Sequence, residues 1–519
     1  MTTTRRPVLL LPLLGALLAL VLAACGGSGN EDASPTSVVP AGVPIYVDVT
    51  VRPEGDLRAD FDAAAGKVLR TQNPSAQIRK LVDETLREED FSYAKDVQPW
   101  LGRRAGAFLT DFSQDGAQGA VVLTTSDTGA TLDALEKSAE GELQDSSVAG
   151  SDYSRDDEGN AFAAVEDVVV AGTEGGVRAA IEATEQGKTL EGSRPFTRAR
   201  EAVSPERLAL GWINLGTILD VAAKDPTFPR ETLGPLRQLL VRQGAEGVTL
   251  ALSADGNAVR VDAAALARPQ EGAPDPAAAA QMLRSAPGDA FAAIGLADLG
   301  GQITRQLELL GQSGAVPGGD PQALLEGLGQ QLGINVERDL LAWMGDGVLF
   351  ARGSGLDIGG ALVVESSDPA ATRRGIAGIR RLLRATDVDA EIEEADVEGA
   401  EGLKLEFPDL PAAVFLVTAG DRFVAAVGES SLQAAIDPDS ALGEAEGFRQ
   451  ATSALGGGVQ PALYVDVATV ADLLAAFAGA AEVPEVAQAL RYLEAFTGLA
   501  AGGQQAGDVQ RFRLALRLR

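Results

Sequence analysis

The sequence predicts an α+β protein built from two tandem homologous domains, which follow a signal peptide and a flexible tether. Short runs rich in Val, Ala and Phe lie between Gly and Asp turns and alternate with amphipathic helical segments. Several neighbouring runs are joined by loops short enough for hairpins, which favours antiparallel pairing. The same motifs recur in two halves of the chain. We therefore expect each half to form a mostly antiparallel sheet with helices packed on one face.

The first element, residues 1–24, has the pattern of an export signal. Arg5 and Arg6 precede an apolar run, residues 9–22, that is too short to span a bilayer comfortably. The arginine pair lacks the fuller motif of a twin-arginine signal, so we expect general secretion.

The only cysteine, Cys25, directly follows this apolar run. The residues before it are Leu22, Ala23 and Ala24, and together the four form the pattern of a lipobox. The pattern predicts cleavage after residue 24 and acylation of Cys25. Two or more acyl chains give stable membrane attachment, so we expect a lipoprotein on the outer face of the cytoplasmic membrane.

Two segments of low apolar content mark the domain boundaries. Residues 25–38 begin with the lipidated cysteine and are rich in Gly, Ser, Asn, Asp and Pro, as in a flexible tether. Residues 268–281 carry three prolines and no large apolar residue before Met282, as in a linker. The predicted domains are therefore residues 39–267 and 282–519.

A short motif with one tryptophan identifies the two copies most clearly. The matching residues are Asp96, Trp100 and Gly102 in the first copy, and Asp339, Trp343 and Gly345 in the second. Other motifs recur in the same order, including Phe196 with Phe448 and Trp212 with Tyr464. We interpret the motif tryptophans as core anchors and the aspartates as caps or turn residues. A ligand-stacking role for the rings is the alternative.

These tryptophan segments resemble the uncharacterised bacterial family called domain of unknown function 3352. The resemblance includes the opening segment, residues 40–55, and the short stretch at residues 193–196. It spans nearly all of the mature chain and implies a secreted or membrane-tethered bacterial protein. The family brings no known activity, ligand or catalytic residue.

Composition excludes several classes of function. The formal net charge is -31, and it becomes -33 when two arginines leave with the signal (-31 minus 2). Such an acidic surface repels nucleic acid, so we expect no nucleic-acid partner. Histidine is absent, which excludes Ser-His-Asp and Cys-His catalysis and imidazole zinc sites. We find no complete catalytic or metal-binding motif, and we predict no cofactor, no metal and no enzymatic activity.

One predicted helix, residues 372–384, carries a local basic patch. Its arginines are Arg373, Arg374, Arg380, Arg381 and Arg384. Such a patch could contact a phosphate or an anionic lipid headgroup. The alternative is a solvated face paired with nearby acids, among them Glu391, Glu393 and Glu394.

The sequence therefore favours a non-enzymatic binding or scaffold protein of the bacterial cell envelope. Its expected partners are the membrane, through the lipid anchor, and an envelope protein or a lipid ligand. One alternative is a lipid or glycolipid carrier. The other is a carboxylate-based hydrolase acting on wall polymers, which needs two acids about 5 to 10 Å apart.

Overall fold

The computed structural model describes residues 33–519 except 88–91, 114–115, 138, 140, 225–229, 270–271, 313–320, 334, 355–356, 386–388 and 482–489. The predicted signal peptide, the lipobox with Cys25 and most of the predicted tether lie outside the described residues. Within the described ranges, no helix combines the length and the apolar character needed to cross a membrane.

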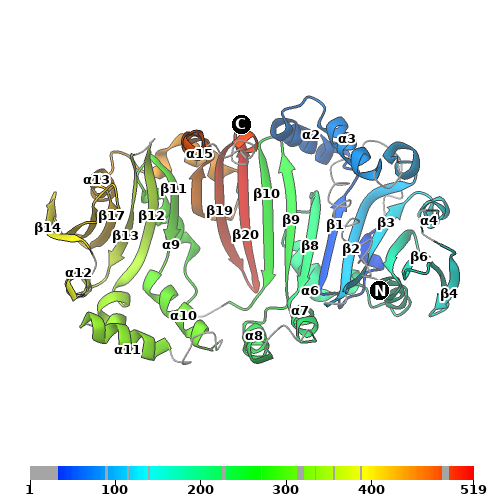
Figure 1. The fold of residues 1–519 in the computed structure, drawn as a ribbon, viewed down its shortest axis with the longest axis horizontal. Coiled ribbons are helices and arrows are strands. Elements are labelled where there is room, and N and C mark those ends of the chain that lie inside the picture. Colours follow the sequence, from blue (N-terminus) through cyan, green and yellow to red (C-terminus); the bar gives the residue numbers. More distant parts are fainter. Residues whose placement is uncertain are drawn as a thin grey trace, which may run out of the picture. The chain divides into compact units, whose positions relative to one another are not determined.

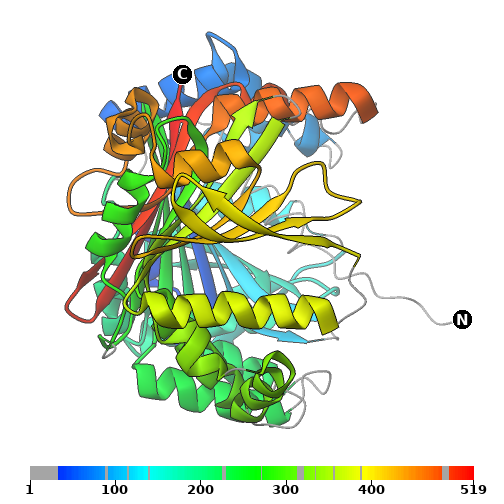
Figure 2. The ribbon, with the colours of Figure 1, turned by 90° about the vertical axis from the view of Figure 1, so that its left-hand side faces the viewer.

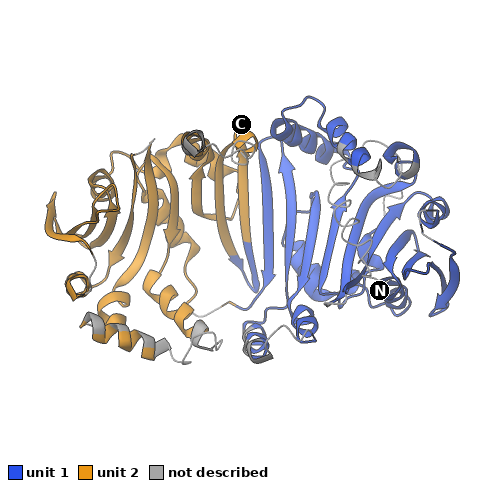
Figure 3. Ribbon diagram, viewed as in Figure 1, with its two compact units in different colours: residues 1–268, 505–511 blue, residues 269–504, 512–519 orange. Residues whose placement is uncertain are grey.

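The chain divides into two compact units (Figure 3). Unit 1 comprises residues 1–268 with 505–511, and unit 2 comprises residues 269–504 with 512–519. The first boundary falls in the predicted linker, residues 268–281. From Pro276 onward that linker is helical, because Asp275 caps the helix and accepts a bond of 2.9 Å from the Ala277 N–H.

Unit 1 contains one antiparallel sheet (Figure 1). Its strands are β1 (Ile45–Thr50), β2 (Leu101–Ser113), β3 (Gly116–Thr125), β4 (Gln144–Val148), β5 (Ser151–Arg155), β6 (Asn160–Val165), β7 (Val168–Thr173), β8 (Ala209–Asn214), β9 (Gly247–Asp255) and β10 (Ala258–Leu266). They are paired in the order β4-β5-β6-β7-β3-β2-β1-β8-β9-β10, and each pair is antiparallel.

Short helices connect these strands. They are η1 (Pro35–Ser37), α2 (Gly55–Leu69), α3 (Pro74–Arg87), the π-helical turn η2 (Tyr93–Val97), α4 (Thr128–Glu136), α5 (Glu174–Glu185), η3 (Leu190–Gly192), α6 (Arg194–Glu201), α7 (Leu215–Ala222) and α8 (Arg230–Gln243). Helix α4 is capped by Asp127, which accepts a hydrogen bond of 2.9 Å from the Ala130 N–H.

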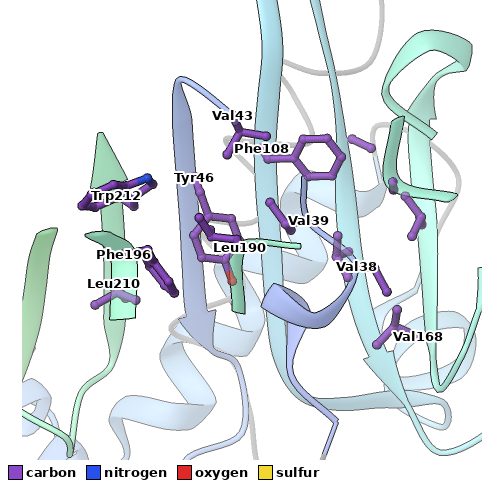
Figure 4. Close-up of a cluster of buried hydrophobic side chains, with 14 of the residues drawn as sticks. Val38, Val39, Val43, Tyr46, Phe108, Val168, Leu190, Phe196, Leu210 and Trp212 are labelled. Atoms are coloured by element: carbon purple, nitrogen blue, oxygen red, sulfur yellow. The ribbon is translucent and has the colours of Figure 1, made fainter. Parts of the chain in front are cut away.

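Unit 1 has two hydrophobic cores that share the same sheet. Tyr46 lies in one core with helices α5 and α6, and its ring contacts Phe196, which contacts Trp212 (Figure 4). The next strand residue, Val47, packs against the other core, to which α2 and α3 contribute. Successive strand residues point to opposite faces. Helices therefore cover both faces in unit 1, where the sequence led us to expect one.

Unit 2 also contains an antiparallel sheet. Its strands are β11 (Ala290–Leu296), β12 (Met344–Ser354), β13 (Asp357–Ser366), β14 (Glu391–Val397), β15 (Ala400–Glu406), β16 (Val414–Ala419), β17 (Arg422–Val427), β18 (Gln460–Asp466) and β19 (Phe496–Ala506). The last strand, β20 (Val509–Leu518), belongs to unit 2 from residue 512 onward. Strands β11 to β19 are paired in the order β14-β15-β16-β17-β13-β12-β11-β18-β19, and each pair is antiparallel. The α+β class and the antiparallel pairing predicted from the sequence are confirmed.

The helices of unit 2 have a similar distribution along the chain. They are α9 (Pro276–Ser285), α10 (Leu299–Gln312), α11 (Pro321–Leu332), the π-helical turn η4 (Glu337–Leu341), α12 (Pro369–Ala385), α13 (Glu429–Ile436), η5 (Leu442–Glu444), α14 (Glu446–Ser453) and α15 (Val467–Ala481). Figure 2 shows α12 as a straight helix beside the β14–β15 hairpin. Its apolar residues pack into a core with β13, β15 and β17.

The two units have the same strand order when β1 to β9 are matched with β11 to β19. Equivalent rings also contact each other edge to face: Phe196 with Trp212 at 5.7 Å between centroids, and Phe448 with Tyr464 at 5.4 Å. These are the positions that the sequence comparison aligned. The shared order supports an internal duplication, which stays a prediction.

Candidate functional site

Both motif tryptophans are buried in hydrophobic cores. Trp343 packs edge to face on Phe423, with 5.5 Å between ring centroids, and its Nε1–H donates to the Asp339 carbonyl at 2.9 Å. Trp100 belongs to the unit 1 core that contains α2 and α3. These positions suit core anchors and leave no open ring face for a ligand.

The tryptophan carbonyls make the same contact in both units. The Trp100 carbonyl accepts a hydrogen bond from the Ser126 N–H at 3.3 Å, and the Trp343 carbonyl accepts one from the Ser367 N–H at 3.0 Å. The glycine that follows permits close strand approach: a Cβ on Gly102 would lie 2.5 Å from the Thr124 carbonyl oxygen, and one on Gly345 would lie 3.2 Å from that of Glu365. The motif therefore joins the start of one long strand, β2 or β12, to the end of the strand that follows it, β3 or β13.

Asp339 carries a buried carboxylate in the turn η4, and Asp96 lies in the corresponding turn η2. The Asp339 oxygens accept bonds from Arg338 Nε at 2.9 Å, Arg338 Nη2 at 2.8 Å and the Asn335 N–H at 3.0 Å. Arg374 Nε adds a fourth at 3.2 Å. The bonds from Arg338, above all, hold the pKa of this carboxyl well below its usual range, although burial acts to raise it.

The structure does not bring the five predicted patch arginines to one site. Arg374 pairs with Asp339, and Arg381 donates to the Gly333 carbonyl at 3.3 Å. Arg380 pairs with Glu394 at 3.1 Å, one of the acids named from the sequence. Arg384 is exposed at the end of α12. Arg373 and Arg380 line one hollow together.

This hollow, of about 490 Å³, lies between α12 and the β14–β15 hairpin. Its lining comprises Arg373, Ile376, Ala377, Arg380, Glu394, Ala395, Asp396, Glu401, Gly402 and Leu403. Three carboxylates outnumber two guanidiniums here, and Glu394 already pairs with Arg380. This charge balance does not favour a phosphate or an anionic headgroup.

A different feature of unit 2, one face of its sheet, is apolar and open to solvent. Ile294, Leu349, Ile358 and Val427 are 39%, 45%, 37% and 41% exposed. All four lie on strands that have a neighbouring strand on each side. The residues between them on the other face, such as Ala293, Val348 and Phe350, are buried. One face of β11, β12 and β13 is therefore packed while the opposite face meets water.

We call this surface the uncharged face of unit 2. Directly paired residues of adjacent strands share a face, and we restrict the name to the part on β11, β12, β13, β17 and β18. The register gives its members there: Ala292, Ile294, Leu296, Gly347, Leu349, Ala351, Ile358, Gly360, Leu362, Val364, Phe423, Ala425, Val427, Leu463 and Val465. No member is charged, in a chain of which 23% of residues are charged. Val364 and Phe423 are packed in the core with α12, and Leu362 and Ala425 pack against the same core.

Unit 1 has an equivalent uncharged face. On β8, β9 and β10 it comprises Ala209, Gly211, Ile213, Val248, Leu250, Leu252, Val261, Ala263 and Ala265. Leu250 and Val261 are exposed. The register continues it through Val47 and Ala107, which pack in the core with α2 and α3.

Sequence reasoning missed both faces, although a signal was present. An antiparallel strand with one wet face alternates apolar and polar residues. Residues 348–350 and 361–364 are instead continuously apolar. We interpreted such runs as ordinary strands, and only the register and the exposure show which side is open.

The described part of the chain shows no cluster of three His, Cys, Asp or Glu side chains that could hold a metal ion. The buried carboxylates Asp48 and Asp339 are each paired with arginine. These two buried carboxylates therefore have structural partners. The uncharged faces are the surfaces whose exposed apolar composition is typical of a contact with another molecule.

Comparison with known proteins identifies a family. A family model described as "Protein of unknown function (DUF3352)" matches residues 8–518. No curated protein sequence matches the chain. Among solved structures, crystal form III of TP0453 is 13% identical with a TM-score of 0.24, covering 47% of this chain and 83% of that one. Crystal form IV gives 13%, 0.24, 45% and 81%. A TM-score this low carries no argument.

Proposed function

We propose that this chain, which belongs to the DUF3352 family of proteins of unknown function, is a membrane-anchored extracytoplasmic lipoprotein that binds a ligand or partner without catalysing a reaction. The lipobox that ends at Cys25 supports the anchor. The first described residue, Ala33, comes eight positions later. Eight extended residues span at most about 28 Å, so the anchor would keep unit 1 close to the bilayer.

The anchor is tested by a Cys25→Ala substitution in the chain's own host. Cells are fed an alkyne-bearing palmitate, and the protein is examined for label and for partition between membrane and soluble fractions. We expect the parent chain and a Ser28→Ala control to be labelled and membrane-bound. The Cys25→Ala chain should carry no label. Labelling that survives this substitution would refute acylation at Cys25.

The binding role is carried by one observation, the uncharged and exposed sheet face. Large contiguous apolar patches on a soluble surface mark contacts with another molecule. Each unit has such a face. In unit 1 it lies opposite the core that contains Tyr46, and in unit 2 it lies opposite the buried residues Val348 and Phe350. A catalytic site would instead need convergent polar groups, which the face does not offer.

A lipid or glycolipid carrier is the second candidate, and the lack of charge on the face favours it. The test is to purify the full-length protein from its own host and compare its masses under native and denaturing conditions. A carrier releases a lipid on denaturation beyond the acyl chains bound to Cys25. A scaffold shows the same mass in both states. Its protein partners would then be sought by cross-linking in the cell envelope.

A further inference from the structure

We propose that the uncharged face of unit 2 binds the hydrocarbon chain of a membrane lipid. The proposal rests on the binding role proposed above and names the ligand class and the site. Its centre is the exposed part of β11, β12 and β13, where Ile294 and Leu349 are directly paired across two strands. Leu349 is in turn paired with Leu362.

The exposed apolar surface of this face is unfavourable in water. Burial of apolar area is worth about 25 cal/mol per Å², so large exposed side chains favour any apolar molecule that covers them. Ile294, Leu349 and Val427 are each about two-fifths exposed. They lie in the middle of a sheet, where backbone pairing on both sides holds them in place. The site is therefore preformed.

Charge restricts the part of the ligand that contacts the face. The chain has 74 acidic and 43 basic residues, yet none lies on the face within β11, β12, β13, β17 and β18. The register reaches its first carboxylates, Glu401, Asp396 and Glu394, only on β15 and β14. A charged group placed against it would lose water without gaining a partner. The part of the ligand that contacts the face must accordingly be uncharged.

The hydrogen-bonding capacity of the face distinguishes a lipid ligand from a protein partner. The backbone groups of β11, β12 and β13 are already used by strands on both sides, so no peptide strand can be added there. Protein interfaces form about one hydrogen bond per 100–200 Å². The side chains of this face offer none. A hydrocarbon chain needs none.

The size of the face can be compared with that of an acyl chain. The row Leu463, Ile294, Leu349, Leu362 and Ala425 crosses β18, β11, β12, β13 and β17. Its last two residues are partly buried at the edge of the core under α12. Four strand spacings of about 4.8 Å make this row about 19 Å long. One acyl chain accounts for half of a hydrocarbon core about 30 Å thick, or about 15 Å. Beside this row lies a row of small residues, Ala292, Ala351 and Gly360, which leaves room for the chain.

The test uses the full-length protein mixed with phosphatidylcholine vesicles in which a small fraction of the lipid carries a diazirine on its acyl chain. After irradiation and digestion, mass spectrometry locates the label. We expect label on peptides from β11, β12 and β13. A Leu349→Glu substitution places a charge against the hydrocarbon chain, so it should lower the labelling at least about tenfold. A tenfold change in binding corresponds to about 1.4 kcal/mol.

The matched control is Leu410→Glu, because Leu410 belongs to the same unit and is 49% exposed but lies in the loop between β15 and β16. It should leave the labelling unchanged. Equal labelling of the Leu349→Glu and parent chains overturns the proposal. The proposal is also overturned if the face carries no label and Leu349→Glu halves the molecular mass in solution. That result would assign the face to contact with a second copy of the chain.

Two further readouts separate this proposal from the proposed function. Acylation is read from the mass of the peptide that begins at Cys25. A labelled face on a chain without that acyl mass refutes the anchor and supports lipid binding. A face labelled only in a Cys25→Ala chain would mean that the protein's own acyl chains occupy it, which overturns the proposal as stated.

Discussion

At the scale of single residues, Asp339 shows how the chain uses a buried charge. Both carboxylate oxygens accept hydrogen bonds, and the donors come from the neighbouring Arg338, from the Asn335 backbone and from Arg374 on α12. The carboxylate thus ties turn η4 to α12. Its tryptophan neighbour, Trp343, is held by the same turn.

Replacing Asp339 with Asn should destabilise unit 2 by about 1.5–3 kcal/mol at pH 7, the usual contribution of hydrogen bonds to a charged group. Because the folded-state pKa of Asp339 is depressed, its contribution is present above the unfolded value near 4 and is lost as pH falls through the folded value. The difference between the two chains should therefore shrink below about pH 4. Urea unfolding at pH 7 and pH 3 measures it, with the exposed Asp409→Asn as the control.

Asp48 is a second buried carboxylate, at the centre of unit 1. Its Oδ1 accepts from Arg104 at 2.5 Å, and its Oδ2 accepts from the Tyr46 hydroxyl at 3.0 Å. Burial, together with the negative charge of Asp48, raises the pKa of Tyr46 well above its usual value.

Removing both partners should cost less than the sum of removing each one. Arg104→Leu leaves Asp48 buried without its cation, which we expect to destabilise the fold by about 3–5 kcal/mol. The double variant Asp48→Asn/Arg104→Leu should lose less than the sum of the single variants. A double-mutant cycle by equilibrium unfolding checks this. Strict additivity would mean that the two groups do not interact.

At the scale of elements, helix starts were predictable and sheet faces were not. Asp127 and Asp368 are signals that act over three residues, and each accepts the N–H bonds expected of a cap. The pairing of Arg374 with Asp339 joins residues 35 positions apart, so no local pattern indicates it. The open face needs both strand register and the positions of all helices, and these are properties of the folded chain.

The two caps offer a matched test of equivalence between the units. Asp127→Ala and Asp368→Ala should each cost about 1 kcal/mol, because each removes a cap at the start of α4 or α12. Equilibrium unfolding measures each loss of stability, and hydrogen exchange locates it in the chain. Protection should fall in the first turn of the substituted helix and stay unchanged in the other. Losses that differ by several kcal/mol would contradict equivalent roles.

At the scale of the whole molecule, the absence of histidine gives a plain pH dependence. No side chain of the chain has an ordinary pKa between 5 and 8. The unfolding temperature should therefore stay constant from pH 6 to 8 and decline below about pH 4, where carboxylates gain protons. Differential scanning calorimetry across this range tests it. A transition near pH 6.5 would require a strongly shifted group.

The division of the chain predicts the result of cutting it. Residues 505–511 belong to unit 1, where the Asp508 side chain pairs with Arg198 and its carbonyl accepts a bond of 2.9 Å from the Ala267 N–H. A protease site inserted at residues 270–275 should therefore yield two fragments that elute together on gel filtration. Separate elution, against the uncut chain as reference, would contradict this assignment.

The same seven residues have a consequence for the export that we propose. A chain that crosses a membrane from its amino terminus delivers residues 1–268 first and residues 505–511 almost last. Domains usually fold as they emerge. Unit 1 includes a segment made some 240 positions later. Under the export that we propose, the protein would therefore complete its fold only when translocation has nearly finished. Until then, its apolar strands would depend on factors that hold unfolded chains at the outer face of the membrane.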